Sequence, residues 1–118
     1  MFARRPGRLD DFGIGDLALR IDDAKPSLLI CADAGMRSGK VIRYKPLVDA
    51  ALAEAQSPPP RVLVVHRGLD KDMPVTEGRD VDYAAASAAF AEAEVPVVWR
   101  ESNAPSYLLY TSGTTGKP

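Results

Sequence analysis

The fold is decided by two apolar runs, Ser27-Leu-Leu-Ile-Cys-Ala32 and Arg61-Val-Leu-Val-Val-His66. Each is short, continuous and rich in leucine, isoleucine or valine, which is typical of a strand buried on both faces of a sheet. Between them, residues 45–57 repeat apolar side chains at helical spacing. The apolar face of this helix consists of Val48, Ala51, Leu52 and Ala55. Strand, helix and strand in this order favour a parallel pair covered by the helix.

Working outward, the same alternation continues. We expect a helix over 17–25, with Asp16 as its N-cap and Pro26 ending it, and a third helix over 83–94 capped by Asp82. Shorter strands are predicted over 95–100 and 107–110, and loops over 33–43 and 67–82. The sequence therefore predicts an α/β fold, with a mostly parallel sheet covered by helices.

Composition narrows the function classes. A chain of 118 residues is long enough for one modest domain. The net charge of -1, from 15 basic and 16 acidic residues, provides no electrostatic basis for binding nucleic acid or an anionic membrane. One cysteine cannot form an internal disulfide or a zinc cluster, so the reducing cytoplasm is the expected compartment. No metal-binding pattern is expected.

Several single residues have a structural interpretation. Cys31 is predicted to be a core residue. His66, at a strand end, has no visible nucleophile partner and is interpreted as structural rather than as a general base. Trp99 is expected to pack inside. Four aspartates do not have the spacing of a calcium-binding loop and are interpreted as solvated charges: Asp70, Asp72, Asp80 and Asp82.

The segment from Tyr107 to Pro118 changes abruptly from apolar to polar. Two glycines, Gly113 and Gly116, allow a ligand to approach the backbone closely, and successive N–H groups in such a turn form an anion site. Phosphate oxygens can also bind four hydroxyls and one cation, from Thr111, Ser112, Thr114, Thr115 and Lys117. The glycine spacing differs from that of a Walker A loop. The alternative is a surface turn or linker.

A second candidate site is Arg37-Ser38-Gly39-Lys40, which places two cations around a glycine just beyond a strand. Ligands of open α/β sheets bind at the carboxyl ends of strands, so a phosphate contact is physically reasonable. The alternative is a solvated basic turn.

Residues 110–118 resemble the signature loop of the adenylate-forming superfamily, which includes the acyl-CoA synthetases. The resemblance implies that Thr111, Ser112, Gly113, Thr114, Thr115, Gly116 and Lys117 hold the β- and γ-phosphates of ATP. The Arg37–Lys40 segment is similar to the Ala-Gly-x-Arg-Gly-Gly-Lys segment of acetyl- and propionyl-CoA synthetases, where basic residues contact coenzyme A phosphates. Ser38 replaces a smaller residue of that pattern, and Arg43 stands where relatives often have proline.

The resemblance extends over residues 12–118 and is strongest to propionyl-CoA synthetases, with acetyl-CoA synthetases second. It implies part of the large N-terminal domain of that fold, whereas residues 1–11 depart from the family. The implied reaction joins propionate or acetate to CoA through an acyl-adenylate, using ATP and Mg²⁺ and releasing AMP and diphosphate. We expect a fragment without catalytic residues of its own that is inactive alone. The alternative is a small, self-standing phosphate-binding or interaction module.

Overall fold

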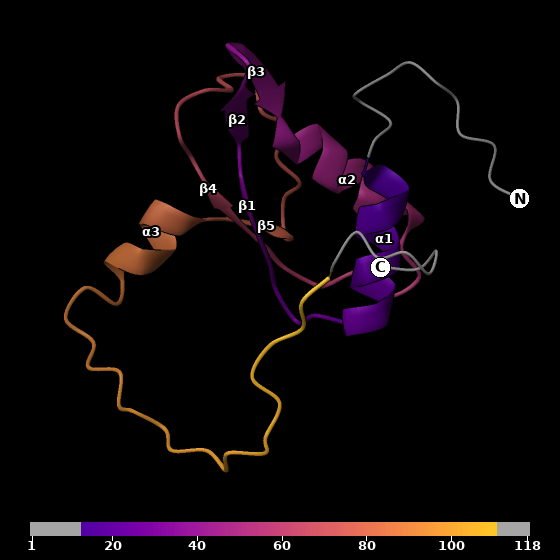
Figure 1. Cartoon of the computed structure of the whole chain (residues 1–118). Helices are drawn as coiled ribbons and strands as arrows, with labels where there is room; N and C mark the ends of the chain where they lie inside the picture. Colours follow the sequence, from indigo (N-terminus) through magenta and orange to yellow (C-terminus); the bar gives the residue numbers. More distant parts are fainter. Residues whose placement is uncertain (1–12, 111–118) are drawn as a thin grey trace, which may run out of the picture.

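The computed structural model describes residues 13–110, in which helices and strands alternate along the chain. The elements are α1 (Ile14–Ala24), β1 (Leu29–Ala32), β2 (Ala34–Arg37), β3 (Lys40–Arg43), α2 (Tyr44–Glu54), β4 (Val62–Val65), β5 (Asp80–Asp82) and α3 (Tyr83–Ala88). Figure 1 shows that α3 lies on the opposite side of the strands from α1.

The larger sheet contains three strands in the order β1-β4-β5. Both pairs are parallel: Leu29 is the partner of Val62, which in turn is the partner of Asp80. The predicted α/β class with a parallel sheet is therefore confirmed. The two apolar runs that decided this prediction are the neighbouring strands β1 and β4.

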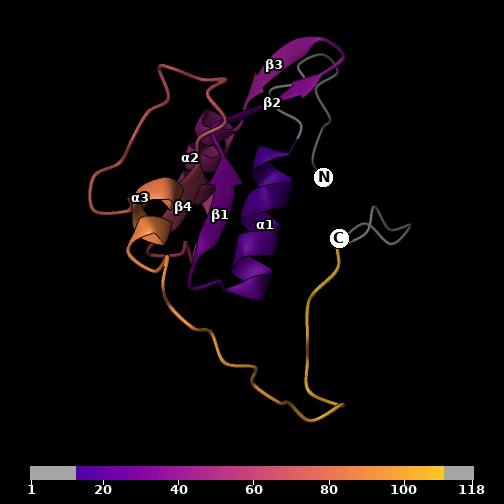
Figure 2. The ribbon, with the colours of Figure 1, turned by 90° about the vertical axis from the view of Figure 1, so that its left-hand side faces the viewer.

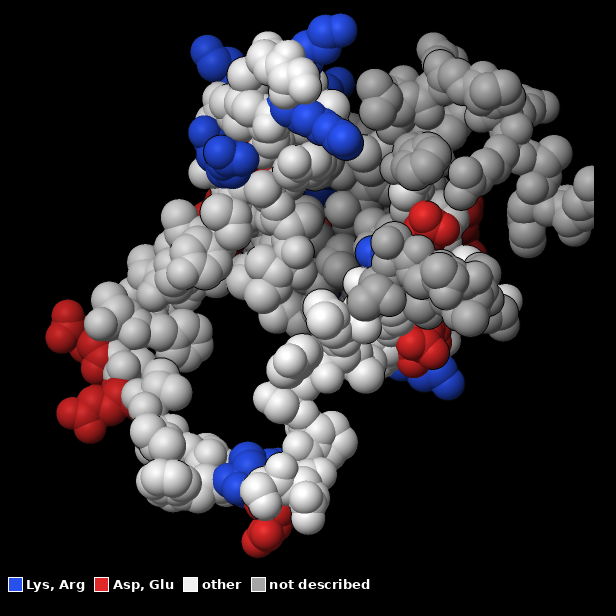
Figure 3. Space-filling model, in the orientation of Figure 1, with Lys and Arg blue, Asp and Glu red and all other residues white. Residues whose placement is uncertain are grey.

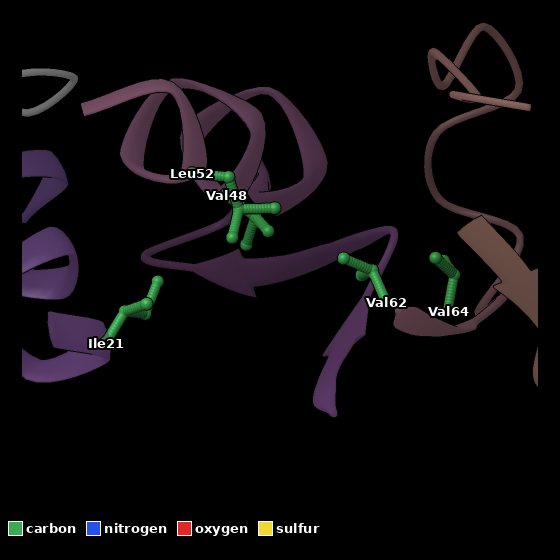
Figure 4. Close-up of a cluster of buried hydrophobic side chains, with 5 residues drawn as sticks. All are labelled: Ile21, Val48, Leu52, Val62 and Val64. Carbon is green, nitrogen blue, oxygen red and sulfur yellow. The ribbon is translucent and has the colours of Figure 1, made fainter. Parts of the chain in front are cut away.

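The core lies between β4 and the helices α1 and α2. Its buried members are the five side chains in Figure 4: Ile21, Val48, Leu52, Val62 and Val64. Burying a side chain of this size contributes about 1.5–3 kcal/mol to stability, so this cluster holds both helices on the sheet. The predicted apolar face of α2 is confirmed, and Cys31 packs against the cluster as predicted.

Helix α1 begins earlier than the sequence predicted. Gly13, with φ 126°, is the N-cap, and it makes no side-chain capping bond. The prediction of Asp16 as the cap is wrong, because Asp16 lies inside the first turn, where its carboxylate still favours the positive end of the helix dipole. The helix ends at Ala24, before Pro26 as expected, with Lys25 in the left-handed conformation.

The predicted burial of β1 on both faces is wrong. Ile30 is 62% exposed, because β1 is an edge strand and only the short helix α3 lies on that side of the sheet. Strand β4 alternates between buried and half-buried residues, with Val62 and Val64 facing the core. The apolar runs identified the strands correctly. Burial of both faces of these strands would need more helices or loops against the sheet than residues 13–110 provide.

The segment predicted as a loop over 33–43 is mostly a β-hairpin. Strands β2 and β3 pair antiparallel, from Ala34 opposite Arg43 to Arg37 opposite Lys40. A two-residue turn allows this pairing, because Ser38 and Gly39 both adopt positive φ, as a type I′ turn requires. The sequence did not predict the hairpin because neither Ala34–Arg37 nor Lys40–Arg43 alternates regularly between apolar and polar residues.

The predicted loop over 67–82 ends in strand β5. Its central residue, Val81, pairs with Leu63, and its flanking residues are aspartates. The expectation that Asp70 and Asp80 are solvated charges is wrong, because only 5% and 2% of their side chains are exposed. Asp70 is paired with Arg43, and Asp80 is paired with Lys45 and Arg79. Asp82 does cap α3, since its carboxylate accepts a 2.7 Å hydrogen bond from the Ala85 N–H.

The chain after α3 has no regular structure as far as Tyr110. Helix α3 ends at Ala88 rather than at residue 94, and the strands predicted over 95–100 and 107–110 are absent from the described chain. These residues form an arc that stands away from the sheet in Figure 1. Trp99, expected to pack inside, is 91% exposed. A strand needs a neighbour for its backbone hydrogen bonds, and residues 13–110 provide none here.

Across residues 13–110, none of the helices combines the length and the apolar character that crossing a bilayer requires.

Candidate phosphate-binding hairpin

The β2–β3 hairpin projects beyond the carboxyl end of β1 (Figure 2). The sequence-predicted residues Arg37, Ser38, Gly39 and Lys40 form its tip. Ser38 has φ 50° and Gly39 has φ 75°, so both lie in the left-handed region that favours glycine. The turn therefore brings the two cations, Arg37 and Lys40, opposite each other at the free end of the hairpin.

Positive charge concentrates around this hairpin. Figure 3 shows blue side chains at the top of the molecule, over β2 and β3, whereas most of the red side chains in that view lie farther down. Arg37, Lys40 and Arg43 are exposed members of these two strands. A group of exposed cations on a short rigid element can attract a phosphate-bearing ligand.

Asp33, which sequence reasoning did not single out, fixes the base of the hairpin. Its side chain is fully buried. The carboxylate accepts four backbone N–H bonds, from Ala34 at 2.7 Å, Arg67 at 3.0 Å, Leu69 at 3.1 Å and Asp70 at 3.3 Å. Burial alone would raise its pKa, but these donors outweigh burial and lower the pKa to about 2.

The backbone of Asp33 joins three elements. Its N–H donates to the carbonyl of Val65 at the end of β4, and its carbonyl accepts from the N–H groups of Tyr44 and Lys45, at 3.0 and 3.3 Å, at the start of α2. The hairpin is therefore tied to both parallel strands and to the helix. The sequence signal was slight: a single acidic residue directly after an apolar run.

Arg43 attaches the hairpin to the loop after β4. Its Nε lies 2.7 Å from Oδ2 of Asp70, and its guanidinium also donates to the carbonyl of Asp72 at 3.3 Å. The hydrogen bond to Asp70 and the charge of Asp70 raise the pKa of Arg43. Arg43 stands where the resembling synthetases often have proline. Unlike proline, it forms an ion pair at this position.

A second group that the sequence did not reveal is the ionic cluster, defined as Lys45, Asp49, Arg79 and Asp80. Lys45 Nζ lies 2.7 Å from Oδ1 of Asp49 and 2.7 Å from Oδ2 of Asp80, and Arg79 contacts both aspartates. Burial would raise the pKa of Asp80, but bonds from Arg79, Lys45 and the Thr76 N–H lower it to about 2. The sequence could have predicted the Lys45–Asp49 pair alone, because residues four apart on a helix are neighbours.

His66 lies at the carboxyl end of β4, where its Nε2 is 3.1 Å from Oδ2 of Asp82. The same aspartate caps α3 through its other oxygen. His66 therefore links β4 to the start of α3, in agreement with its structural interpretation.

The predicted ATP-phosphate loop, residues 111–117, lies outside the described residues. The residue before it, Tyr110, contacts α1: its hydroxyl donates to Oδ2 of Asp23 at 2.6 Å, and the guanidinium carbon of Arg20 lies 5.4 Å from its ring centre. The hydrogen bond to Asp23 raises the pKa of Tyr110. The structure thus places the predicted CoA-binding residues Arg37–Lys40 at one hairpin tip, and the ATP loop stays a prediction from the sequence.

The acidic side chains of the described residues bear on metal binding. Within residues 13–110, no group of three or more histidine, cysteine or acidic side chains could hold a metal ion. Among these acidic residues, Asp49, Asp70 and Asp80 are already paired with Lys45, Arg43 or Arg79. No Mg²⁺ contact is therefore assigned to these residues.

Comparison with known proteins identifies the family. Residues 9–118 match the family model described as AMP-binding enzyme. The chain is 55% identical over 107 residues to the propionate–CoA ligase of Escherichia coli K12 and 53% identical over 107 residues to that of Salmonella typhimurium LT2. Each of these alignments covers 91% of this chain and 17% of the relative. It is 44% identical over 112 residues to the acetyl-coenzyme A synthetase of Pyrobaculum aerophilum, covering 91% of this chain and 16% of that protein. The chain belongs to the AMP-binding enzyme family.

Proposed function

We propose that this chain supplies the CoA-phosphate and ATP-phosphate contacts of a short-chain acyl-CoA synthetase. In the proposed reaction, a short carboxylate attacks the α-phosphate of ATP to give an acyl-adenylate and diphosphate. The CoA thiol then displaces AMP to give the thioester. Propionate is the proposed acid, because identity to the two propionate–CoA ligases, at 53% and 55%, exceeds the 44% to the acetyl-coenzyme A synthetase.

The observation that carries the proposal is the hairpin tip with Arg37, Ser38, Gly39 and Lys40. Two cations and a turn with positive φ stand at the end of a short hairpin whose base is fixed by Asp33 and Arg43. A cation on such a fixed element can bind a phosphate oxygen without first being ordered, which lowers the entropic cost of binding. In this proposal, Arg37 and Lys40 contact the 3′-phosphate and diphosphate of CoA, and Ser38 and Gly39 donate from the turn.

The proposal assigns the phosphates of ATP to residues 111–117. Backbone N–H groups, hydroxyls and the cation of Lys117 would orient the triphosphate and stabilise the charge that develops as diphosphate leaves. ATP, CoA and the carboxylate are small-molecule substrates of the proposed reaction, and Mg²⁺ would accompany ATP. No catalytic residue is assigned within this chain.

The first test is binding of CoA to the 118-residue chain, followed by amide chemical shifts in NMR. CoA should perturb Arg37–Lys40, and Arg37→Ala combined with Lys40→Ala should weaken binding at least tenfold. Dephospho-CoA, which lacks the 3′-phosphate, should bind more weakly to the natural chain than CoA does. Arg100→Ala, which removes an exposed cation from the arc, is the matched control and should bind CoA like the natural chain.

Two results would overturn the proposal. One is CoA binding that is equal in the double variant and the natural chain, because the hairpin cations would then not contact the phosphates. The other is binding of ATP alone, with no response to CoA. That result would favour the self-standing nucleotide-binding module over a contribution to a CoA ligase.

A further inference from the structure

The hairpin face that carries the two predicted CoA-binding cations also carries an aromatic ring. Arg37 and Lys40 are direct partners in the antiparallel pairing, so their side chains leave the same face. Gly35 precedes Arg37 by two residues, and alternate residues of a strand share a face. The face at Gly35 is therefore the face of the cations.

Tyr44 occupies this face. A Cβ atom added to Gly35 would overlap the hydroxyl oxygen of Tyr44 and would lie 2.7 Å from Cε2 of its ring. The ring thus takes the place of a side chain that Gly35 lacks. The backbone of Tyr44 is held in place, because Tyr44 is the first residue of α2 and its N–H donates to the Asp33 carbonyl at 3.0 Å.

The ring is also accessible. Tyr44 is 38% exposed, although it packs against the hairpin backbone at Gly35. Two residues along a strand span about 7 Å, so the ring lies one strand repeat away from the base of the Arg37 side chain. An exposed aromatic surface beside two cations is the combination that proteins use to bind a nucleotide, with stacking for the base and positive charge for the phosphates.

The nucleotide of CoA has the matching arrangement. Its ribose separates an adenine base from a 3′-phosphate and a 5′-diphosphate, so base and phosphates require neighbouring but separate contacts. We propose that Tyr44 is the stacking surface for the adenine of CoA while Arg37 and Lys40 bind its phosphates. This inference rests on the proposed function and adds to it the residue that recognises the base.

Two probes distinguish the contribution of the base to binding from that of the phosphates. They are adenosine 3′,5′-bisphosphate and ribose 3,5-bisphosphate, which has no base. Both are titrated into the 118-residue chain and followed by NMR. In Tyr44→Leu, adenosine 3′,5′-bisphosphate should bind about five- to a hundredfold more weakly, which is the range expected for loss of base stacking. Tyr44→Phe keeps the ring and should bind within about twofold of the natural chain.

Two controls accompany these variants. Ribose 3,5-bisphosphate should bind Tyr44→Leu and the natural chain equally, because it makes no stacking contact. Tyr83→Leu removes an exposed tyrosine from α3 and should leave binding of both probes unchanged. In the natural chain, the adenine H2 and H8 resonances should shift upfield when the base stacks on a ring. This last measurement requires no variant and is independent of the folding of Tyr44→Leu.

Equal binding of adenosine 3′,5′-bisphosphate to Tyr44→Leu and the natural chain, or the absence of an upfield shift, would overturn the inference. Failure of the proposed function looks different. In that case ribose 3,5-bisphosphate would also leave the Arg37 and Lys40 resonances unperturbed. If the phosphates bind at the hairpin and Tyr44 has no effect, the CoA assignment stands and the base-binding role of Tyr44 is rejected.

Discussion

Lys45 and Asp80 form a buried ion pair, with 2.7 Å between Nζ and Oδ2. Solvent reaches 0% of the lysine side chain and 2% of the aspartate side chain. The pair connects the first turn of α2 to the first residue of β5. Because α2 begins directly after β3, this pair also helps to fix the base of the hairpin that carries the candidate site.

Lys45→Met is expected to destabilise the chain by about 3 kcal/mol, because removing one partner leaves the buried carboxylate of Asp80 with Arg79 as its one remaining cation among the described residues. Methionine keeps the length and apolar character of the lysine side chain. The free energy of unfolding is measured by urea denaturation, followed by circular dichroism. Lys71→Met, at an exposed lysine, is the control and should change stability by less than about 0.5 kcal/mol. Equal stability of both variants would contradict a structural role for the ionic cluster.

Stability is expected to fall in acid. Asp33 and Asp80 have folded-state pKa values of about 2, below the ordinary value of 3.8. A carboxyl group whose pKa is lowered by folding stabilises the folded state above its unfolded pKa, and this stabilisation is lost as the pH falls through its folded pKa. The urea midpoint should therefore decrease between about pH 4 and pH 2.

The variant Asp33→Asn tests the source of this acid sensitivity. An amide offers one acceptor oxygen where the carboxylate offers two, so backbone N–H donors of the loop after β4 lose their partner. The variant should be less stable than the natural chain at pH 7, and its urea midpoint should depend less on pH below pH 4. A pH profile parallel to that of the natural chain would show that Asp33 does not contribute.

Gly35→Ala should be destabilising by about 1–3 kcal/mol, because the new methyl group would overlap the Tyr44 ring. Tyr44→Leu removes that overlap, so the same glycine substitution should be much less costly in the Tyr44→Leu background. A double-mutant cycle of thermal or urea unfolding measures this coupling. Additive effects of the two substitutions would contradict the packing of Tyr44 on Gly35.

Ser38→Asn should stabilise the hairpin by a few tenths of a kcal/mol, because asparagine tolerates the left-handed conformation that Ser38 adopts at φ 50°. Ser38→Val should destabilise it by at least 1 kcal/mol, since a β-branched side chain is strained at positive φ. Thermal unfolding of both variants provides the measurement. Equal melting temperatures would argue against the type I′ turn.

The sequence by itself determined the class of the fold and predicted where the candidate site lies. Two apolar runs separated by a helical pattern predicted β1, α2 and β4 and their parallel pairing, because hydrophobic periodicity is a local property. The chemistry of Arg37–Lys40 could likewise be inferred from residue types. The glycine at position 39 already indicated a turn.

Only the tertiary structure showed how that site is held. Asp33 accepts hydrogen bonds from the N–H groups of Arg67, Leu69 and Asp70, and Lys45 pairs with Asp80, in both cases across long separations in sequence. A buried charge looks like a solvated one in the sequence, because its partners are brought to it only by folding. Strand β5 and the position of the Tyr44 ring also depend on tertiary structure. Residues 80–82 form a strand because they pair with β4, and the Tyr44 ring fits against the hairpin because Gly35 has no side chain.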